Sequence, residues 1–167
     1  MDIKNGYKAF NSDYTNNYGK VFLEGEVYHI DGEISFGIKG NGYHFCKRIE
    51  DTFRYINDDN KIVAEVVGFG KIVESMDEYY EYFDMYSASS IKIKRFLSRD
   101  EVFNYILHAN EFVVKRFIVT GFKLTDGEIA MLRNYFYNSN AICDYIDYYY
   151  LNKRDVFEDK VKKMVLK

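Results

Sequence analysis

The 167-residue chain lacks proline and tryptophan, and Cys46 and Cys143 are its only cysteines. The two cysteines are too far apart in sequence to form a metal-spaced pair, so no metal is expected, and they are typical of reduced thiols in a cytoplasmic protein. No apolar run reaches the ~20 residues that span a bilayer, and no signal peptide follows Met1. These absences predict a cytoplasmic protein without a metal site and without contact to a membrane.

An excess of basic residues is also missing. The chain has 23 Lys and Arg residues against 26 Asp and Glu residues, which gives a formal net charge of -3. Direct nucleic-acid binding by counterion release over the whole surface is therefore not expected. With 47% hydrophobic and 29% charged residues, the chain has enough apolar material for one domain, or for a core with a small appendage.

Familiar catalytic motifs are absent as well. The sequence has no His-x-Glu, no metal-spaced Cys/His set, no phosphate-binding glycine loop and no Gly-x-Ser-x-Gly elbow. It has instead an abundance of aromatic residues, with 17 Tyr and 14 Phe. Either the codon bias of an AT-rich genome or a tyrosine-rich contact surface explains this composition.

Residues 1–97 are predicted to be mostly β-structure. Short apolar or alternating segments are bounded by turn residues, as at Asp31-Gly32. One helix is expected at residues 49–56, where apolar residues recur at helical spacing. Strands are expected at residues 6–10, 21–23, 27–30, 33–36, 62–67 and 91–94.

Residues 98–167 have a different character and are predicted to be helical. Ser98 with Glu101, and Thr125 with Glu128, have the spacing of capping boxes, in which both side chains bond to the opening N–H groups of a helix. Further helices are expected at residues 112–119, 141–151 and 156–166. The expected fold is thus α+β, with an antiparallel β-rich core followed by a small C-terminal helical bundle.

A short central segment is the candidate ligand site. Gly40 and Gly42 flank a turn before the run Tyr-His-Phe-Cys, and glycine lets a flat ligand approach the backbone closely. His44 is interpreted either as a core histidine or as a pocket residue that stacks on an aromatic ligand. Tyr55 either packs its helix against the sheet or forms the second wall of a flat slot, because aromatic rings favour offset stacking.

Residues 74–84 combine acidic and aromatic side chains. They are interpreted as a solvated acidic loop, or as the source of a catalytic carboxylate, Glu81 or Asp84. A third interpretation is a docking surface for a basic partner. The residues of that docking surface are Asp77, Glu78, Tyr79, Tyr80 and Glu81.

Residues 40–45, GNGYHF, are followed by Tyr55 on the expected helix and by residues 64–68, AEVVG. This series resembles the catalytic core of the ADP-ribosyltransferase superfamily, in particular its poly(ADP-ribose) polymerase branch. The superfamily has a Gly-x-Gly-Ile-Tyr-Phe strand, a short helix that ends in a tyrosine, and a Glu-Val-x-x-Gly strand. Residues 86–97 are similar to the terminal strand region of the same core.

The resemblance implies an ADP-ribosyltransferase-like core with a site for NAD. In the superfamily the nicotinamide stacks between two tyrosines; here His44 would replace the first and Tyr55 would match the second. Gly42 and Tyr43 would lie beside them, and Tyr7 stands where the superfamily has its opening histidine. A late carboxylate, Glu81 or Asp84, would steady the charge at the ribose carbon as nicotinamide leaves. The residues leave open whether such a site is active.

A second resemblance covers nearly the whole chain. Residues 6–10 (GYKAF), 31–34 (DGEI), 40–46 (GNGYHFC) and 121–125 (GFKLT) resemble an uncharacterised family found in bacteria and their phages, which implies a setting in phage–host conflict. Two functions follow as hypotheses. One is an ADP-ribosyltransferase-like protein that binds NAD and modifies a host macromolecule. The alternative is a non-enzymatic, anti-CRISPR-like inhibitor of a bacterial defence system that binds a host protein or ribonucleoprotein through residues 74–84.

Overall fold

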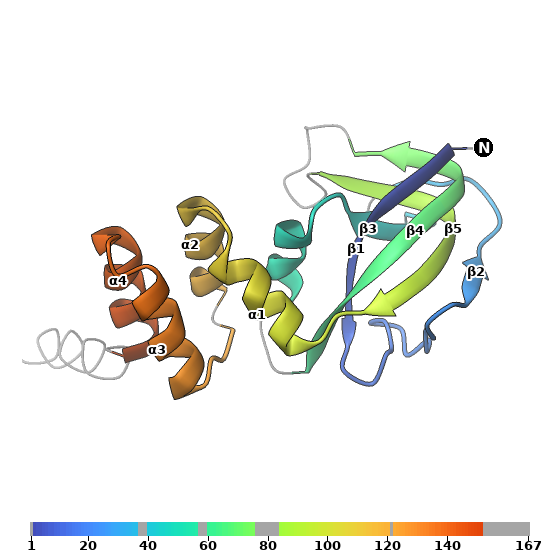
Figure 1. Cartoon of the computed structure of the whole chain (residues 1–167). Helices are drawn as coiled ribbons and strands as arrows, with labels where there is room; N and C mark the ends of the chain where they lie inside the picture. Colours follow the sequence, from blue (N-terminus) through green and yellow to red (C-terminus); the bar gives the residue numbers. More distant parts are fainter. Residues whose placement is uncertain (1, 37–39, 57–59, 76–83, 121, 152–167) are drawn as a thin grey trace, which may run out of the picture. The chain divides into compact units, whose positions relative to one another are not determined.

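The computed structural model describes residues 2–36, 40–56, 60–75, 84–120 and 122–151 (Figure 1). The chain divides into two compact units, Met1–Val102 and Phe103–Lys167. This division falls inside a helix, whereas the sequence predicts a boundary between residues 97 and 98. Each unit buries apolar residues of its own.

The first unit is a five-stranded antiparallel sheet that closes on itself. Its strands are β1 (Asp2–Asn11), β2 (Val27–His29), β3 (Tyr43–Cys46), β4 (Lys61–Glu74) and β5 (Met85–Phe96), and the 3-10 helix η1 (Ile49–Tyr55) joins β3 to β4. The strand order is β2-β5-β3-β1-β4, and β4 also pairs with β5. The strands β1, β3, β5 and β4 therefore form a closed ring, here called the barrel, in which they curve around one another (Figure 1). The predicted α+β class with an antiparallel sheet is confirmed.

Apolar side chains fill the interior of this ring, because alternate residues of each strand point inward. Phe45 is 1% exposed and packs against the bare backbones of two glycines. A Cβ at Gly6 would lie 2.6 Å from its Cδ2 atom, and a Cβ at Gly68 would lie 2.5 Å from its Cε1 atom. Both glycines are thus required by the phenylalanine between them. The buried cluster comprises Phe10, Phe22, Phe45, Ala64, Val66, Ala88, Ile91 and Ile93.

The helices begin at side-chain caps. Helix α1 (Arg99–Leu107) follows the predicted capping box, in which Glu101 N donates to Ser98 Oγ (3.1 Å) and Ser98 N donates to Glu101 Oε2 (2.8 Å). The box of Thr125 and Glu128 is also present, at the start of α3. Both boxes are confirmed. The other helical segments are α2 (Glu111–Val119), α3 (Asp126–Tyr135), α4 (Asn140–Ile146) and the π turn η3 (Asp147–Leu151).

The second unit buries apolar residues from three of its helices. Val114, Phe117, Leu132, Ile142 and Ile146 are all fully buried, and α2 and α3 each contact α4. The helices predicted at residues 112–119 and 141–151 are confirmed in position, and the second of them ends in the π turn. The helix predicted at residues 156–166 lies outside the described residues. Within the described part of the chain, no helix is long and apolar enough to cross a membrane.

Two predicted strands are wrong. Residues 21–23 form only an isolated bridge to Thr15, because their central phenylalanine turns into the core. Residues 33–36 lie outside the sheet, and Ser35 N donates instead to Asn41 O (2.9 Å), a residue that also lies outside the strands.

The helix predicted at residues 49–56 is confirmed in position, but it is a 3-10 helix. Its N-cap residue, Arg48, makes no side-chain capping bond. The hydroxyl of Thr52 instead donates to Ile49 O (2.6 Å), three residues back, which matches the tighter 3-10 spacing.

Candidate functional site

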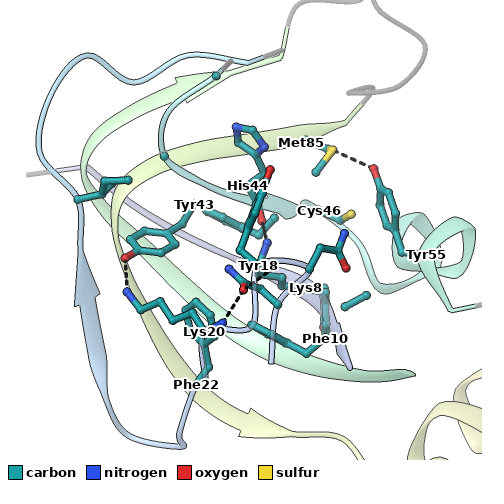
Figure 2. A pocket seen from close by; sticks show the side chains of 18 of the residues that line it. Lys8, Phe10, Tyr18, Lys20, Phe22, Tyr43, His44, Cys46, Tyr55 and Met85 are labelled. Carbon is teal, nitrogen blue, oxygen red and sulfur yellow. Dashed lines mark hydrogen bonds between the residues drawn. The ribbon is translucent and has the colours of Figure 1, made fainter. Parts of the chain in front are cut away.

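The edges of β1 and β3 separate after one residue pair, Tyr7 with Cys46. A continued antiparallel ladder would place residues 8–10 opposite residues 43–45. A pocket of about 650 Å³ lies there instead (Figure 2). This volume is within the range of sites for small molecules and cofactors. The two strand edges contribute residues 7–10 and 42–46 to its walls, and the loop side chains Asn16, Asn17, Tyr18, Lys20 and Phe22 also line it.

The charges in this pocket are all of one sign. Lys8, Lys20 and Lys61 line it, and no Asp or Glu among the described residues does. The chain as a whole carries a formal net charge of -3, so the excess of cations is local to the pocket. Such an arrangement favours an anionic ligand.

Lys8 is the cation nearest the barrel interior. Its Nζ donates to His44 O (2.6 Å) and lies 5.7 Å from the ring centroid of Phe10. Burial lowers the pKa of this lysine to about 8, against a smaller opposing effect of the Cys46 thiol. The side chain thus bridges the two separated strands at a point where a backbone ladder would otherwise continue.

The other two lysines are held by neutral groups. Lys20 Nζ is 3.1 Å from Tyr43 Oη and 4.9 Å from the ring centroid of Tyr28, which is within the range of a cation–π interaction. Lys61 Nζ donates to Asn11 Oδ1 (2.6 Å). Since a lysine ammonium has three N–H donors, these contacts leave donor capacity for a ligand.

His44 already has a stacking partner within the protein. Its imidazole stacks on Phe36 at a centroid distance of 5.0 Å and an interplanar angle of 23°. Its Nε2 lies 3.2 Å from Ser35 O. Burial lowers the pKa of the imidazole, so the ring is neutral at neutral pH. The sequence predicts that the His44 ring stacks on a ligand, but Phe36 already covers one face of that ring.

The structure brings all five residues predicted to bind a cofactor to this pocket. Tyr7, Gly42, Tyr43, His44 and Tyr55 all line it. In Figure 2, Tyr43 with its bond to Lys20 and Tyr55 with its bond to Met85 lie on opposite sides of the view. The hydroxyl of Tyr55 donates to the Met85 sulfur at 3.4 Å, and its side chain is 37% exposed.

Gly42 serves packing within the sheet. Its φ is +121°, and a Cβ there would collide with Ser87 Oγ and lie 2.9 Å from Ile34 Cγ2. The space beside its backbone is thus filled by the protein. Packing alone therefore explains why position 42 is a glycine, and no ligand is needed to explain it.

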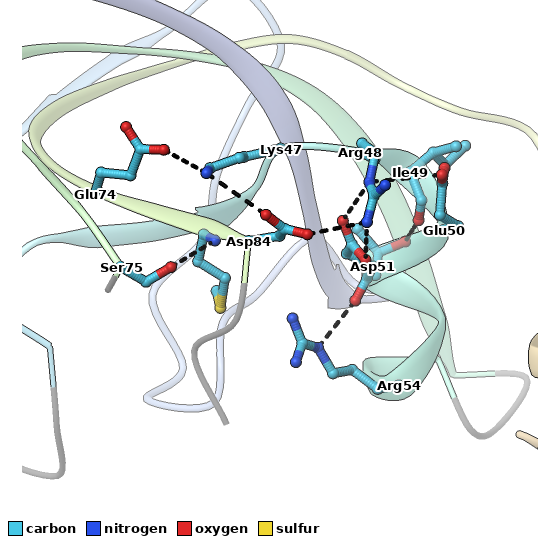
Figure 3. A network of polar contacts seen from close by, with 11 residues as sticks. Lys47, Arg48, Ile49, Glu50, Asp51, Arg54, Glu74, Ser75 and Asp84 are labelled. Atoms are coloured by element: carbon cyan, nitrogen blue, oxygen red, sulfur yellow. Dashed lines mark hydrogen bonds and ion pairs between the residues drawn. The ribbon is translucent and has the colours of Figure 1, made fainter. Parts of the chain in front are cut away.

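Of the two carboxylates predicted to be catalytic, the structure describes only Asp84. Asp84 is not among the lining residues; it pairs with Arg48 (3.0 Å) and Lys47 (3.6 Å) (Figure 3). Lys47 also pairs with Glu74, so this network ties the start of η1 to both ends of the β4–β5 connection. Glu81 lies outside the described residues.

The predicted docking surface also lies outside the described residues. Asp77, Glu78, Tyr79, Tyr80 and Glu81 all belong to the undescribed stretch 76–83, so the docking surface stays a prediction. Among the described residues, no group of three or more His, Cys, Asp or Glu side chains could hold a metal.

Sequence reasoning missed the three lysines of the pocket. A usable signal was the alternation in GYKAF, because Gly6 and Phe10 face the interior and Lys8 must share their side of the strand. Lys20 and Lys61 carried no comparable signal, since each reaches the pocket only through the folding of its own loop or strand end.

Comparison with family models gives a match over residues 4–105 to a family described as a domain of unknown function, DUF7666. The chain belongs to this family. The DUF7666 match contains every residue that lines the pocket, from Tyr7 to Met85, and leaves α2 to α4 outside. No curated protein and no solved structure matches the chain.

Proposed function

We propose that the barrel pocket binds an anionic nucleotide, and that NAD is the first candidate. The observation that carries this proposal is the lining of the pocket, in which three lysines and several aromatic rings meet without a described carboxylate. A nucleotide combines the two features that such a lining selects, a phosphate and a flat ring. The resemblance of residues 40–68 to the ADP-ribosyltransferase core supports NAD among the nucleotides.

The contacts of the lysines suit a phosphate group. Each ammonium is now bonded to a neutral oxygen, at His44 O, Tyr43 Oη and Asn11 Oδ1. A phosphate adds a charge–charge attraction to these hydrogen bonds that a neutral oxygen does not supply. A phosphate in the pocket would therefore compete well for these donors.

Flat rings have several partners in the same pocket. Tyr43 and Tyr55 line it from two sides, and Tyr18 lies in the loop that contributes Lys20 (Figure 2). Offset or edge-to-face contacts between rings contribute about 0.5–1.5 kcal/mol beyond the burial of area. The charge of the ligand is thus expected to govern its affinity, and the ring is expected to refine its specificity.

Transfer of ADP-ribose to a host macromolecule is the catalytic extension of this proposal, and it rests on the resemblance alone. It needs a carboxylate beside the ribose, and the candidates are Glu81 and Asp84. Asp84 is engaged by Arg48 and Lys47. Binding is for this reason the first property to measure, and transfer the second.

Calorimetric titration of the full chain with NAD, ADP-ribose and nicotinamide tests the proposal. NAD and ADP-ribose are expected to bind, with an affinity that falls as the salt concentration rises, whereas nicotinamide alone is expected to bind much more weakly. A ligand with a Kd of 100 μM should stabilise the fold by about 1.4 kcal/mol at 1 mM. Absence of any heat or stabilisation with every anionic nucleotide would refute the proposal.

Two lysines of β4 provide matched variants. Lys61→Gln removes a charge that lines the pocket, and Lys71→Gln removes one from an exposed residue of the same strand that does not. The first substitution is expected to weaken nucleotide binding about tenfold, and the second to leave it unchanged. Equal effects of the two would show that binding follows net charge and not the pocket.

A further inference from the structure

Lys8 reaches the pocket from the inner face of the barrel. It alternates along β1 with Gly6 and Phe10, which both face the interior, and its neighbour on β4 is the fully buried Ala64. Among the described residues, its amine donates a hydrogen bond to His44 O. No described carboxylate forms a salt bridge with it, so the amine is directed at the pocket without a counter-ion.

Two titratable groups that interact electrostatically with this amine, Cys46 and His44, are neutral near neutral pH. Burial raises the pKa of the Cys46 thiol to about 11 and lowers that of the His44 imidazole. Arg54 and Asp51, on η1, act on the Cys46 thiol with opposite signs. Neither group places a negative charge beside the amine, and with a pKa of about 8 about half of it is unprotonated at pH 8.

We propose that Lys8 is a carbonyl-reactive amine that forms a reversible imine with anionic aldehydes or 2-oxo acids entering the pocket. The lone pair of the neutral Nζ attacks the carbonyl carbon, and a C–N bond forms. Both hydrogens of the amine leave with the carbonyl oxygen as water, and the C=N double bond remains. The step needs no oxidant or reductant. Buried lysines with a lowered pKa are the ones that serve as Schiff-base lysines in enzymes.

The remaining lysines of the pocket define the class of the carbonyl compound. Lys20 and Lys61 line the same pocket, so a compound that carries a phosphate or carboxylate is favoured over a neutral one. The bond from Lys8 to His44 O holds the amine until such a compound arrives. This reactivity goes beyond nucleotide binding, because NAD has no aldehyde or ketone for the amine to attack.

Pyridoxal 5′-phosphate is a suitable probe, since it is an anionic aldehyde with a flat ring. The full chain would be incubated with it at pH 8, treated with borohydride to reduce any imine, and mapped by peptide mass spectrometry. Lys8 is expected to be labelled about tenfold more than Lys71 and Lys94, which are exposed and outside the pocket. Pyridoxal, which lacks the phosphate, is expected to label Lys8 less. Labelling of Lys8 should also fall as the pH is lowered from 8 to 6, because the neutral amine becomes scarce.

Labelling of Lys8 at or below the level of the exposed lysines would overturn the inference. Lys8→Arg keeps a cation and cannot form an imine, so it should lose the label at position 8, while the labelling of Lys71 and Lys94 stays unchanged. The two proposals fail separately. Nucleotide binding without selective labelling would refute only the imine, and selective labelling without nucleotide binding would refute only the nucleotide.

Discussion

The two edges of β1 differ in how they are sealed. Towards β4 the strand pairs at ten consecutive positions, from Asp2 with Gly70 to Asn11 with Lys61. Towards β3 it pairs at one position, Tyr7 with Cys46. One edge is thus a continuous ladder, and the other is open along residues 8–10.

The residues beside the two edges differ in kind: glycines and an aromatic ring pack at one, and a lysine faces the pocket at the other. On the sealed side, Gly6 of β1 and Gly68 of β4 leave room for the ring of Phe45, which reaches across the interior from β3. On the open side, a lysine occupies an inward position, where an apolar residue would be expected. A half-buried charge without a counter-ion breaks the usual agreement between sequence and fold, and such exceptions concentrate at functional sites. The comparison predicts that the sealed edge supports stability and that the open edge supports binding.

The largest expected effect is the loss of the Phe45 ring, which packs against the two glycines of the sealed edge. Phe45→Ala should lower the free energy of unfolding of the barrel by about 3–5 kcal/mol, because it leaves a cavity between two glycines. Urea unfolding followed by circular dichroism measures this loss. A matched test combines Gly68→Ala with Phe45→Leu: the added methyl group should be less harmful beside the smaller side chain. A strictly additive double variant would contradict the packing described here.

The next effect has the opposite sign. The pKa of Lys8 is lowered from 10.5 to about 8 on folding, so between these values the unfolded chain binds the proton and the folded chain does not. Stability therefore rises with pH across this window, and the full penalty of the buried charge is present below pH 8. Lys8→Met removes the penalty and should raise the free energy of unfolding at pH 7 by roughly 2 kcal/mol.

The pH profile distinguishes this gain from a general effect of apolar substitution. The advantage of Lys8→Met should shrink as the pH rises from 8 towards 10.5, whereas Lys71→Met, at an exposed position, should show no such trend. Denaturant unfolding across this pH range gives both curves. If Lys8→Met were less stable than the wild type at pH 7, the amine would stabilise the fold through its bond to His44 O. The idea that Lys8 is retained for function at a cost in stability would then be wrong.

The smallest effect concerns Asp84, which lies outside the pocket. Its ion pairs with Arg48 and Lys47 are partly exposed, and pairs of this kind contribute about 0.5–1 kcal/mol. Asp84→Asn should therefore lower stability by no more than this amount and leave nucleotide affinity unchanged. Calorimetry and unfolding of the same sample test both statements. A loss of nucleotide affinity would move Asp84 into the binding site and would favour the catalytic role that the sequence predicts.

Local signals in the sequence predicted local structure well. The boxes at Ser98 and Thr125 depend on contacts three residues apart, and both are present. The β-rich character of residues 62–67 and 91–94 also follows from their own residue types. The apolar run at residues 21–23 misled the prediction, because burial of one phenylalanine produces the same pattern as a strand.

The pocket depends on pairing between segments that are distant in sequence. Residues 7, 42–44, and 55 can be identified as candidates by their residue types, but the opening exists because one edge of β1 stays unpaired. No pattern within β1 or β3 encodes which edge is left open. The cationic character was missed for the same reason, since Lys8, Lys20 and Lys61 meet only after the ring has closed.

The most direct test of the open edge as a binding site is a titration of the isotope-labelled chain with NAD, followed through the backbone amide resonances. The largest chemical-shift changes should fall on residues 8–10, 43–45 and Lys61, with small changes along the rest of β4 and in α2 to α4. Saturating changes confined to the helical unit, or none at millimolar nucleotide, would contradict the account.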